Sequence, residues 1–365
     1  MVDCSEISAL LRNLKQQNLF RELNVRDGLD FSSNDYLALS KNTESLDAGV
    51  RAAKLYGTGS TGSRLLSGNK IIFEEFEKKI AKDKKTERAM IFNSGYIANY
   101  SVISAFFAMD YLMIFDKLNH ASMYQGTDPR KLQRFNHLNY NQLEQILEKH
   151  KNCPKKFIAS ETVFGMDGDC ADLAALLYLA KKYDAFLYLD EAHATGLYGK
   201  NGYGLSTNFD FDSESTIIMG TFSKALASSG AYVASSSLIK DYLIQASKGF
   251  IYSTALSPFC IGVAQYNWNL LPQLKDIRKQ LIEKSEYLKK LLTDCGMKYI
   301  GKNTNIVSII LDSIEEMLRA HQKLLNKNII TSAIRRPTAP TPRIRLAINA
   351  GHSYEDIDLL VSAMR

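Results

Sequence analysis

Short apolar runs recur along the first two thirds of the chain, and segments with helical spacing of apolar residues alternate with them. Five of these runs are RAMIF (88–92), YLMIF (111–115), KFIAS (156–160), FLYLDEAHATG (186–196, ending in acidic and histidine residues) and TIIMG (216–220). Strands that are continuously apolar belong to parallel sheets covered by helices on both faces. The pattern therefore predicts an α/β fold with a mostly parallel central sheet.

The pattern changes after about residue 250, where long helices precede two weaker strands, IVSII (306–310) and IRLAI (344–348), and a final helix. A chain of 365 residues, 45% of them hydrophobic, is long enough for one large and one small domain. We expect an N-terminal helical segment at 1–40, a large domain at 41–258 and a smaller α+β domain at 259–365.

Charge and cysteine usage exclude several classes of protein. The net charge of +6 comes from scattered lysines, as in KKIAKDKK (78–85), which we interpret as solvated faces of amphipathic helices and not as a nucleic-acid surface. The five cysteines have neither disulfide-like nor zinc-like spacing and suit a reducing compartment. No apolar stretch is long enough to cross a membrane, and the N-terminus does not resemble a signal peptide. We expect a cytoplasmic protein without metal, membrane or nucleic-acid partners.

One lysine follows the last of these strands in an unusual setting. Lys224 lies in a loop of small residues, TFSKALASSG (221–230). A loop lysine can simply be solvated. In a tight pocket, the same amine could form a Schiff base with an aldehyde cofactor.

The segment LDEAHATG (189–196) supports the second interpretation. Asp190 comes at the end of an apolar strand, and His193 follows three residues later. Such residues can be a helix cap and a core histidine. Pyridoxal phosphate, however, needs a carboxylate beside its pyridine nitrogen to keep that nitrogen protonated. Asp190 could supply that carboxylate, and His193 could donate to the phenolic oxygen of the cofactor.

Three further segments could contact such a cofactor. The imidazole of His120 follows another strand and could stack on the pyridine ring. Ser94, Gly95 and Tyr96 open a predicted helix, whose N-terminus favours a phosphate. The segment GTGSTG (57–62) follows a helical pattern and not a strand, so it fails the context of a dinucleotide fingerprint, and we interpret it as a flexible loop near a phosphate or substrate.

The segment AIRRPTAPTPRIRLAI (333–348) carries four arginines around a proline-rich turn. Guanidinium groups bind carboxylates with two parallel hydrogen bonds, which would suit an acidic substrate. Simple surface charge is the alternative, and it fits Arg336 better than Arg345, which lies within an alternation of apolar residues.

Taken in order, the motifs resemble those of the α-oxoamine synthases, which are fold-type-I pyridoxal-phosphate enzymes. The resemblance rests on SSNDYL, GTGSTGSRLLSGN, HASMYQG, ETVFGMDGD, LDEAHATGLYG, TFSKALASSGAY, FIYSTALSP and RRPTAP with RIRL. It extends over nearly the whole chain and is strongest to the branch that makes 8-amino-7-oxononanoate in biotin biosynthesis.

The resemblance implies roles for single residues around the cofactor. Lys224 matches the Schiff-base lysine, Asp190 the partner of the pyridine nitrogen, and His120 the stacking histidine. His193 and Thr221 match ligands to the oxygen and phosphate regions of the cofactor.

Other matches concern the substrates. Asn34 and Arg345 match the clamp on the amino-acid carboxylate. Arg335 matches an arginine near the acyl donor, and Arg21 matches an N-terminal arginine near the acyl chain.

The resemblance also implies a homodimer with shared active sites. Ser253 and Thr254 match a segment that reaches the phosphate from the partner subunit. Two positions depart from the common pattern: Gly165 stands where many relatives have serine, and Arg336 replaces a frequent proline. Both departures concern the acyl-donor side and not the cofactor chemistry.

The implied reaction is the decarboxylative condensation of L-alanine with a pimeloyl thioester, carried on coenzyme A or on acyl-carrier protein. Three alternatives remain at this point. One is a sibling synthase that uses glycine or serine with another acyl group. The second is a pyridoxal-phosphate aminotransferase. The third is a non-catalytic dinucleotide-binding protein, against which the missing strand before GTGSTG argues.

Overall fold

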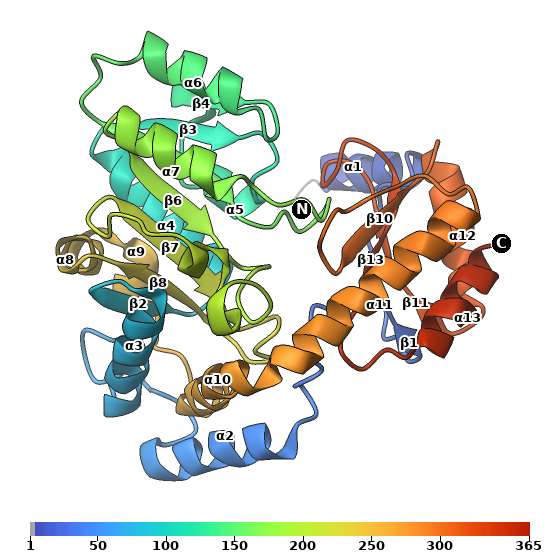
Figure 1. The fold of residues 1–365 in the computed structure, drawn as a ribbon, viewed down its shortest axis with the longest axis horizontal. Helices are drawn as coiled ribbons and strands as arrows, with labels where there is room; N and C mark the ends of the chain where they lie inside the picture. The colour runs from blue at the N-terminus through green and yellow to red at the C-terminus, as the bar shows by residue number, and fades with distance from the viewer. Residues whose placement is uncertain (1–3) are drawn as a thin grey trace. The chain divides into compact units, whose positions relative to one another are not determined.

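The computed structural model of the protein describes residues 4–365, which divide into two compact units (Figure 1). The larger unit holds residues 34–164 and 170–278. The described part of the smaller unit holds residues 4–33, 165–169 and 279–365. The compact units therefore divide the predicted N-terminal segment at residue 33, and residues 1–3 of that segment lie outside the described part. They also divide the chain at 278/279, within a long helix, and not at 258/259.

The larger unit is organised around a seven-stranded sheet. Its strand order is β2–β8–β7–β6–β5–β3–β4, and β7, β6, β5, β3 and β4 run parallel while β8 is antiparallel to both neighbours. The strands are β2 (Arg88–Phe92), β3 (Leu112–Asp116), β4 (Leu132–Phe135), β5 (Lys156–Glu161), β6 (Phe186–Asp190), β7 (Thr216–Thr221) and β8 (Ala231–Ser235). The predicted mostly parallel sheet is confirmed.

Both faces of this sheet are buried, which explains why its strands are continuously apolar. Successive side chains of a strand point to opposite faces. In β3, Met113 and Phe115 pack into one core cluster with α4 (Gly95–Ala108) and α8 (Ser237–Ala246). Ile114 packs into the other cluster, with α6 (Tyr140–Lys149) and α7 (Leu173–Lys182). In β5, Phe157 and Ile158 divide in the same way.

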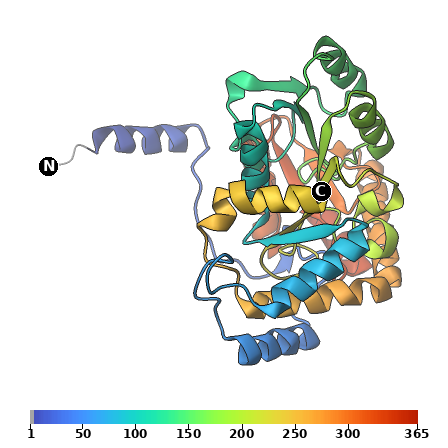
Figure 2. The same ribbon diagram turned by 90° about the vertical axis from the view of Figure 1, so that its left-hand side faces the viewer.

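Helices cover both faces and the edges of the sheet. Figure 2 shows α3 (blue) and α8 (gold) next to β2, the strand at one edge. The helices of this unit are α2 (Thr43–Tyr56), α3 (Ile71–Lys84), α4 (Gly95–Ala108), α5 (Ala121–Tyr124), α6 (Tyr140–Lys149), α7 (Leu173–Lys182), α8 (Ser237–Ala246), α9 (Lys248–Ile251) and α10 (Pro258–Leu270). Short 3₁₀ turns occupy Pro129–Lys131, Lys200–Gly202, Leu205–Asn208 and Leu271–Leu274. The chain leaves the unit through α11 (Lys275–Asp294).

The smaller unit is an α+β structure around a four-stranded antiparallel sheet of order β12–β13–β10–β9. Two short parallel strands, β1 and β11, pair beside it. Its elements are α1 (Ser5–Gln16), β1 (Leu29–Asp30), β9 (Tyr299–Ile300), β10 (Ile306–Ile310), α12 (Ile314–Leu325), β11 (Ile329–Ile330), β12 (Ser332–Ile334), β13 (Arg343–Ala347) and α13 (Tyr354–Met364). Helix α13 begins with a capping box, in which Ser353 and Asp356 satisfy each other's backbone N–H groups.

Some predicted boundaries differ from the structure. The strand expected at 186–196 ends at Asp190, because the Asp190 carboxylate accepts from the backbone N–H of Ala192 and the chain turns there. Strand β4 and helix α8 were not predicted. Among the described residues, no helix is long and apolar enough to span a bilayer.

Candidate active site

A pocket of about 200 Å³ opens in the larger unit, where strands β5, β6 and β7 end and helix α4 begins. Ligands in open α/β sheets bind at this edge, beyond the carboxyl ends of the strands. The pocket brings together most of the residues that the sequence assigned to a cofactor, namely Ser94, Gly95, Tyr96, His120, Asp190, His193, Thr221 and Lys224. Asn99, Glu161, Ala192, Met219 and Ser223 complete its lining.

The parallel strands explain why distant residues meet here. Glu161, Asp190 and Thr221 are the last residues of β5, β6 and β7, and Glu161 and Asp190 are register partners. Asp190 is 4% exposed and Thr221 is 3% exposed, so their side chains form the floor of the pocket. Glu161 was not among the predicted site residues, although it ends a buried strand just as Asp190 does.

Lys224 reaches the pocket from a tight loop after β7. The backbone of this loop is closed by hydrogen bonds from Ala227 N–H to Lys224 O (2.9 Å) and from Ser228 N–H to Phe222 O (2.9 Å). The loop after β6 packs directly against it at Gly196, where φ is +94° and an added Cβ would lie 2.4 Å from Ala225 Cβ. Only glycine fits at this contact, because neither the conformation nor the space tolerates a side chain. The half-buried Lys224 is therefore not a solvated loop lysine.

Asp190 is held by two donors. Its Oδ2 accepts from Asn99 Nδ2 at 2.8 Å, and its Oδ1 accepts from the Ala192 backbone N–H at 2.8 Å. Both contacts use the side chain as an acceptor, which is the role of an ionised carboxylate. Asn99 is 1% exposed and lies one helical turn after Gly95 on the same face of α4. That i, i+4 spacing was the available signal for Asn99.

His120 caps helix α5 and faces the pocket. Its Nδ1 lies 2.7 Å from Ser122 Oγ and accepts from the Ser122 backbone N–H at 3.3 Å. Burial of the ring lowers the pKa of His120 below 6.5, the neighbouring Asp190 acts in the opposite direction, and Lys224 lowers it further. The neutral ring offers a flat face for stacking.

His193 is tied to a segment near the N-terminus. Its Nδ1 lies 2.7 Å from the hydroxyl of Tyr36, and that hydroxyl donates to Asn34 Oδ1 at 3.0 Å. Tyr36 is fully buried. Asn34, predicted to bind the amino-acid carboxylate, is thus linked to His193 within the larger unit. Nothing in the sequence indicated that Tyr36 joins these two residues.

The N-terminus of α4 forms the remaining wall of the pocket. The Oγ of Ser94 accepts from Ile97 N–H at 3.2 Å and caps this 14-residue helix. Thr221 Oγ1 donates to Gly230 O and lies 2.9 Å from Ser223 Oγ. Hydroxyl groups beside a helix N-terminus suit a phosphate. A primary amine, a buried carboxylate and a phosphate-type site therefore occur in one pocket, and these residues fit pyridoxal phosphate.

A buried ion pair anchors the loop that follows Asp190. Lys84, at the end of α3, donates to Glu191 Oε2, to Tyr203 O (2.7 Å) and to Ser206 Oγ (2.9 Å). Both charged side chains are 0% exposed, and burial lowers the pKa of Lys84 while Glu191 opposes that shift. The prediction that the lysines of 78–85 lie on solvated faces is wrong for Lys84, because its helix ends against the buried loop.

Ser253 and Thr254 do not line this pocket. They follow α9 and lie beside the glycine-rich segment, where Thr254 bridges to Ser63 and Ala255 N–H donates to Gly62 O at 2.9 Å. Asn93 Nδ2 also donates to Thr254 O at 2.8 Å. Their predicted contact with the phosphate of a partner subunit stays a prediction.

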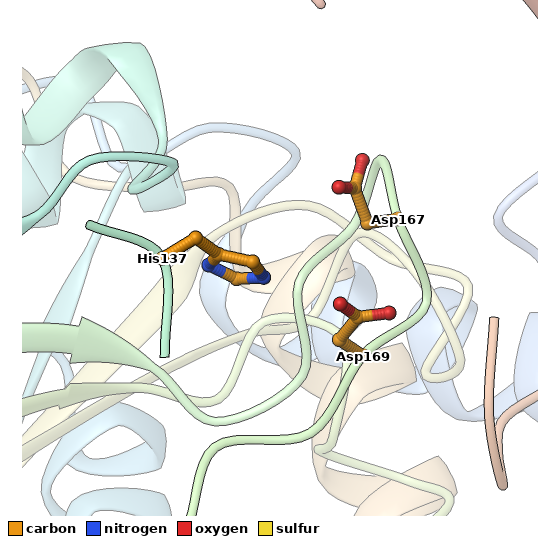
Figure 3. Close-up of side chains that lie close together, drawn as sticks. All are labelled: His137, Asp167 and Asp169. Carbon is orange, nitrogen blue, oxygen red and sulfur yellow. The ribbon is translucent and has the colours of Figure 1, made fainter. Parts of the chain in front are cut away.

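Arg345 belongs to the smaller unit, in β13, and is 3% exposed. Its Nε donates to Gly165 O at 2.6 Å, in the segment 165–169. Arg343, also buried, pairs with Asp167 of that segment, and Figure 3 shows Asp167 and Asp169 projecting from the same loop. The expectation of simple surface charge therefore does not apply to Arg345. Its role on the amino-acid carboxylate stays a prediction.

Arginines also gather elsewhere in the smaller unit. Arg335 is half-buried, its Nη2 donates to Phe20 O at 3.1 Å, and its buried Nε has no hydrogen-bond partner among the described residues. Burial and the charge of Arg21 lower the pKa of Arg335. Arg26 contacts His321 Nε2 at 3.1 Å. We call Arg21, Arg26 and Arg335, with His321, the arginine cluster.

Comparison with known proteins agrees with this geometry. The sequence profile described as aminotransferase class I and II matches residues 26–364. An 8-amino-7-oxononanoate synthase from Lysinibacillus sphaericus is 36% identical over 347 residues, which cover 94% of this chain and 89% of the relative. A protein of Paramagnetospirillum magneticum, provisionally assigned the same name, is 41% identical over 350 residues, or 93% and 88% of the two chains.

Solved structures point the same way. The 8-amino-7-oxononanoate synthase of Francisella tularensis has a TM-score of 0.80 and 28% identity, covering 92% of this chain and 96% of that one. A serine palmitoyltransferase of Sphingomonas wittichii has a TM-score of 0.89 and 25% identity, covering 100% and 97%. The chain belongs to the class I and II aminotransferase family and, within it, to the α-oxoamine synthases: it is a pyridoxal-phosphate-dependent acyltransferase of the 8-amino-7-oxononanoate synthase type.

Proposed function

We propose that the protein condenses L-alanine with a pimeloyl thioester, releasing carbon dioxide and free thiol, to give 8-amino-7-oxononanoate for biotin biosynthesis. The names of relatives at 36% and 41% identity support this choice among the α-oxoamine synthases. The arginine cluster of the smaller unit is the structural observation that carries the choice of acyl donor. Arg335 and Arg21 interact there, and no acidic partner is seen for the Arg335 side chain among the described residues.

The pocket of the larger unit would provide the common chemistry of the family. Bound pyridoxal phosphate supplies an electron sink for the negative charge that forms on the α-carbon of the amino acid. Lys224 would hold the cofactor and, when released, take the α-proton with its amine. Asp190 would keep a proton on the ring nitrogen, His120 would lie against the ring, and the start of α4 with Thr221 would hold the phosphate.

A pimeloyl donor would need a positively charged group, and the arginine cluster of the smaller unit offers one. A pimeloyl chain ends in a carboxylate, and a carboxylate loses much free energy in an apolar channel unless a positive group meets it. Arg335 combines partial burial with an unused donor, whereas Arg336 is exposed and its Nε donates only to Pro340 O, at 3.4 Å. We therefore assign the terminal carboxylate to Arg335 and Arg21.

We further propose a homodimer in which Ser253 and Thr254 complete the partner's cofactor site. Apolar side chains are exposed around that segment: Tyr252 is 80% exposed, Leu66 is 81% exposed and Leu65 is 49% exposed. Exposed apolar groups on linked loops are typical of a protein–protein interface.

In mixed dimers, a Lys224→Ala protomer and a protomer changed at both Ser253 and Thr254 should together regain activity. An active monomer in sedimentation would contradict this proposal.

The experiment that tests the function supplies each of L-alanine, glycine and L-serine with each of pimeloyl, acetyl, succinyl and palmitoyl thioesters. Release of carbon dioxide and of free thiol is followed, with the pimeloyl group offered on coenzyme A and on acyl-carrier protein. We expect the fastest turnover with L-alanine and a pimeloyl donor. Faster turnover with L-serine and the palmitoyl donor, or with glycine and the acetyl donor, would assign the protein to a sibling activity.

A further inference from the structure

We propose that Asn99 is a positioning residue that controls both Asp190 and His120 through one buried amide. The amide Nδ2 donates to Asp190 Oδ2 at 2.8 Å and to Ser122 Oγ at 3.0 Å. The hydroxyl of Tyr188 donates to the amide oxygen at 2.6 Å. Three partner groups, on Asp190, Ser122 and Tyr188, thus converge on this one amide.

The chemistry of the partners fixes the orientation of the amide. An amide nitrogen carries two hydrogens, and the two acceptors use both of them. The reverse orientation would turn the amide oxygen towards the Asp190 carboxylate, so that two acceptors would face each other. Burial raises the pKa of Tyr188 well above 10, and Tyr188 therefore keeps the proton that it donates to the amide oxygen.

The second branch of this arrangement sets the protonation of His120. Ser122 Oγ accepts from Asn99 and therefore has its single proton available for His120 Nδ1, at 2.7 Å. The Ser122 backbone N–H also donates to that nitrogen, at 3.3 Å. Because two donors converge on Nδ1, the neutral ring carries its proton on Nε2.

Burial makes these bonds consequential. Asn99 is 1% exposed, and both Ser122 and Tyr188 are fully buried. A buried polar group that loses its partner cannot turn to water and bears the full cost of its desolvation. Given the cofactor site proposed above, on which this inference rests, one amide therefore couples Asp190, which would lie beside the ring nitrogen, to His120, which would lie against the ring.

Three variants separate the branches. Ser122→Ala removes the hydroxyl beside His120 Nδ1 and should affect only the protonation of that ring. Tyr188→Phe removes the donor to the amide oxygen and should let the Asn99 amide change its orientation. Asn99→Leu removes the bonds to both Asp190 and Ser122 and should affect both branches. The matched control is Tyr232→Phe, because Tyr232 is also fully buried and its hydroxyl bonds Thr195 Oγ1 at 3.0 Å outside the pocket.

The readouts are nitrogen NMR of the His120 ring in the cofactor-free protein, nitrogen NMR of ring-labelled pyridoxal phosphate in the loaded protein, and the dissociation constant of pyridoxal phosphate. We expect the Nε2–H tautomer in the unmodified protein and in Tyr232→Phe. Ser122→Ala should give mixed tautomers with an unchanged signal from the cofactor nitrogen.

Asn99→Leu should change both signals and raise the dissociation constant about 10- to 100-fold, as expected for a lost hydrogen bond to a charged group. If Asn99→Leu does not fold, Ser122→Ala decides the His120 branch and Tyr188→Phe decides the amide orientation. An Nδ1–H tautomer in the unmodified protein, or unchanged signals in all three variants, would overturn the proposal.

Discussion

The pocket of the larger unit and the arginine cluster of the smaller unit are built in opposite ways. In the pocket, Asp190 and Asn99 are 4% and 1% exposed, and their polar atoms bond to named partners. In the cluster, Arg21 and Arg26 are exposed, and the buried Nε of Arg335 has no hydrogen-bond partner among the described residues. We infer that packing holds the cofactor pocket in place, whereas the acyl recognition proposed above would depend on a few side chains that are mostly exposed.

The comparison predicts its largest effect at Asp190. Asp190→Asn keeps the size of the side chain but cannot hold the ring nitrogen protonated. Exchange of the α-proton of L-alanine with solvent should fall on the order of 10²- to 10³-fold, the range for loss of one preorganised electrostatic contact, while pyridoxal phosphate still binds. Exchange is followed by proton NMR in deuterated water. Near-normal exchange would show that the pocket does not depend on this carboxylate.

The buried ion pair gives the next largest effect, on stability. Lys84→Met leaves Glu191 buried without its cation and should lower the free energy of unfolding by about 3–5 kcal/mol, measured by denaturant titration. The double variant Lys84→Met/Glu191→Leu should recover much of that loss, since no buried charge remains. The control is Lys151→Met, because the Lys151–Glu148 pair is exposed. A stable single variant would mean that water reaches Glu191.

Substitution in the arginine cluster should act on one substrate only. Arg335→Ala should raise KM for a pimeloyl donor about 10- to 100-fold, because a hydrogen-bonded charge pair is lost. KM for a neutral acyl donor of equal length should not change, and the pyridoxal phosphate affinity should also stay the same. Arg336→Ala is the matched control. An equal rise in KM for both donors would mean that Arg335 supports the fold and does not bind the carboxylate of the pimeloyl group.

The smallest expected effect is on the pH dependence of stability. His352, in the smaller unit, is 4% exposed; its Nδ1 accepts from Asn349 N–H at 3.2 Å, and its Nε2 bonds Asp30 O at 3.0 Å. Burial lowers the pKa of His352 below 6.5, so the unfolded chain binds this proton more readily than the folded one.

Neutral His352 therefore makes its full contribution to the free energy of unfolding above pH about 6.5, the pKa of histidine in the unfolded chain. That contribution is lost as the pH falls through the lower pKa of the folded state. An NMR titration of the His352 ring should have its midpoint below pH 6.5. The His120 ring should behave in the same way, because burial also lowers its pKa. His352→Gln should weaken the decrease in unfolding midpoint between pH 7.5 and 5. A ring midpoint at or above 6.5 would contradict the assignment.

The sequence predicted the parts of the molecule that follow from regular periodicity. Continuous apolar runs identified strands of the central sheet, and the parallel arrangement explains why Asp190 and Lys224 share one pocket. Loop position was also informative for His120 and Ser94. These predictions succeed because the carboxyl ends of parallel strands meet at one edge of the sheet.

The residues that the sequence did not reveal are buried polar side chains in apolar surroundings. Asn99 lies in GYIANYSVISAFFA, a helix that is apolar on most sides, so its spacing of four residues from Gly95 was the only local indication of its place in the pocket. Lys84 lies in a run of lysines (78–85), most of which are not buried, and only the tertiary packing shows that it is enclosed. Tyr36 reaches His193 from 157 positions away, and local patterns carry no information on that contact.

The most direct test of the account is the site of cofactor attachment. Protein loaded with pyridoxal phosphate is reduced with borohydride, digested, and mapped by mass spectrometry. The account predicts a pyridoxyl group on Lys224, the amine that lines the pocket with Asp190 and His120. A label on another lysine, with Lys224 unmodified, would contradict it.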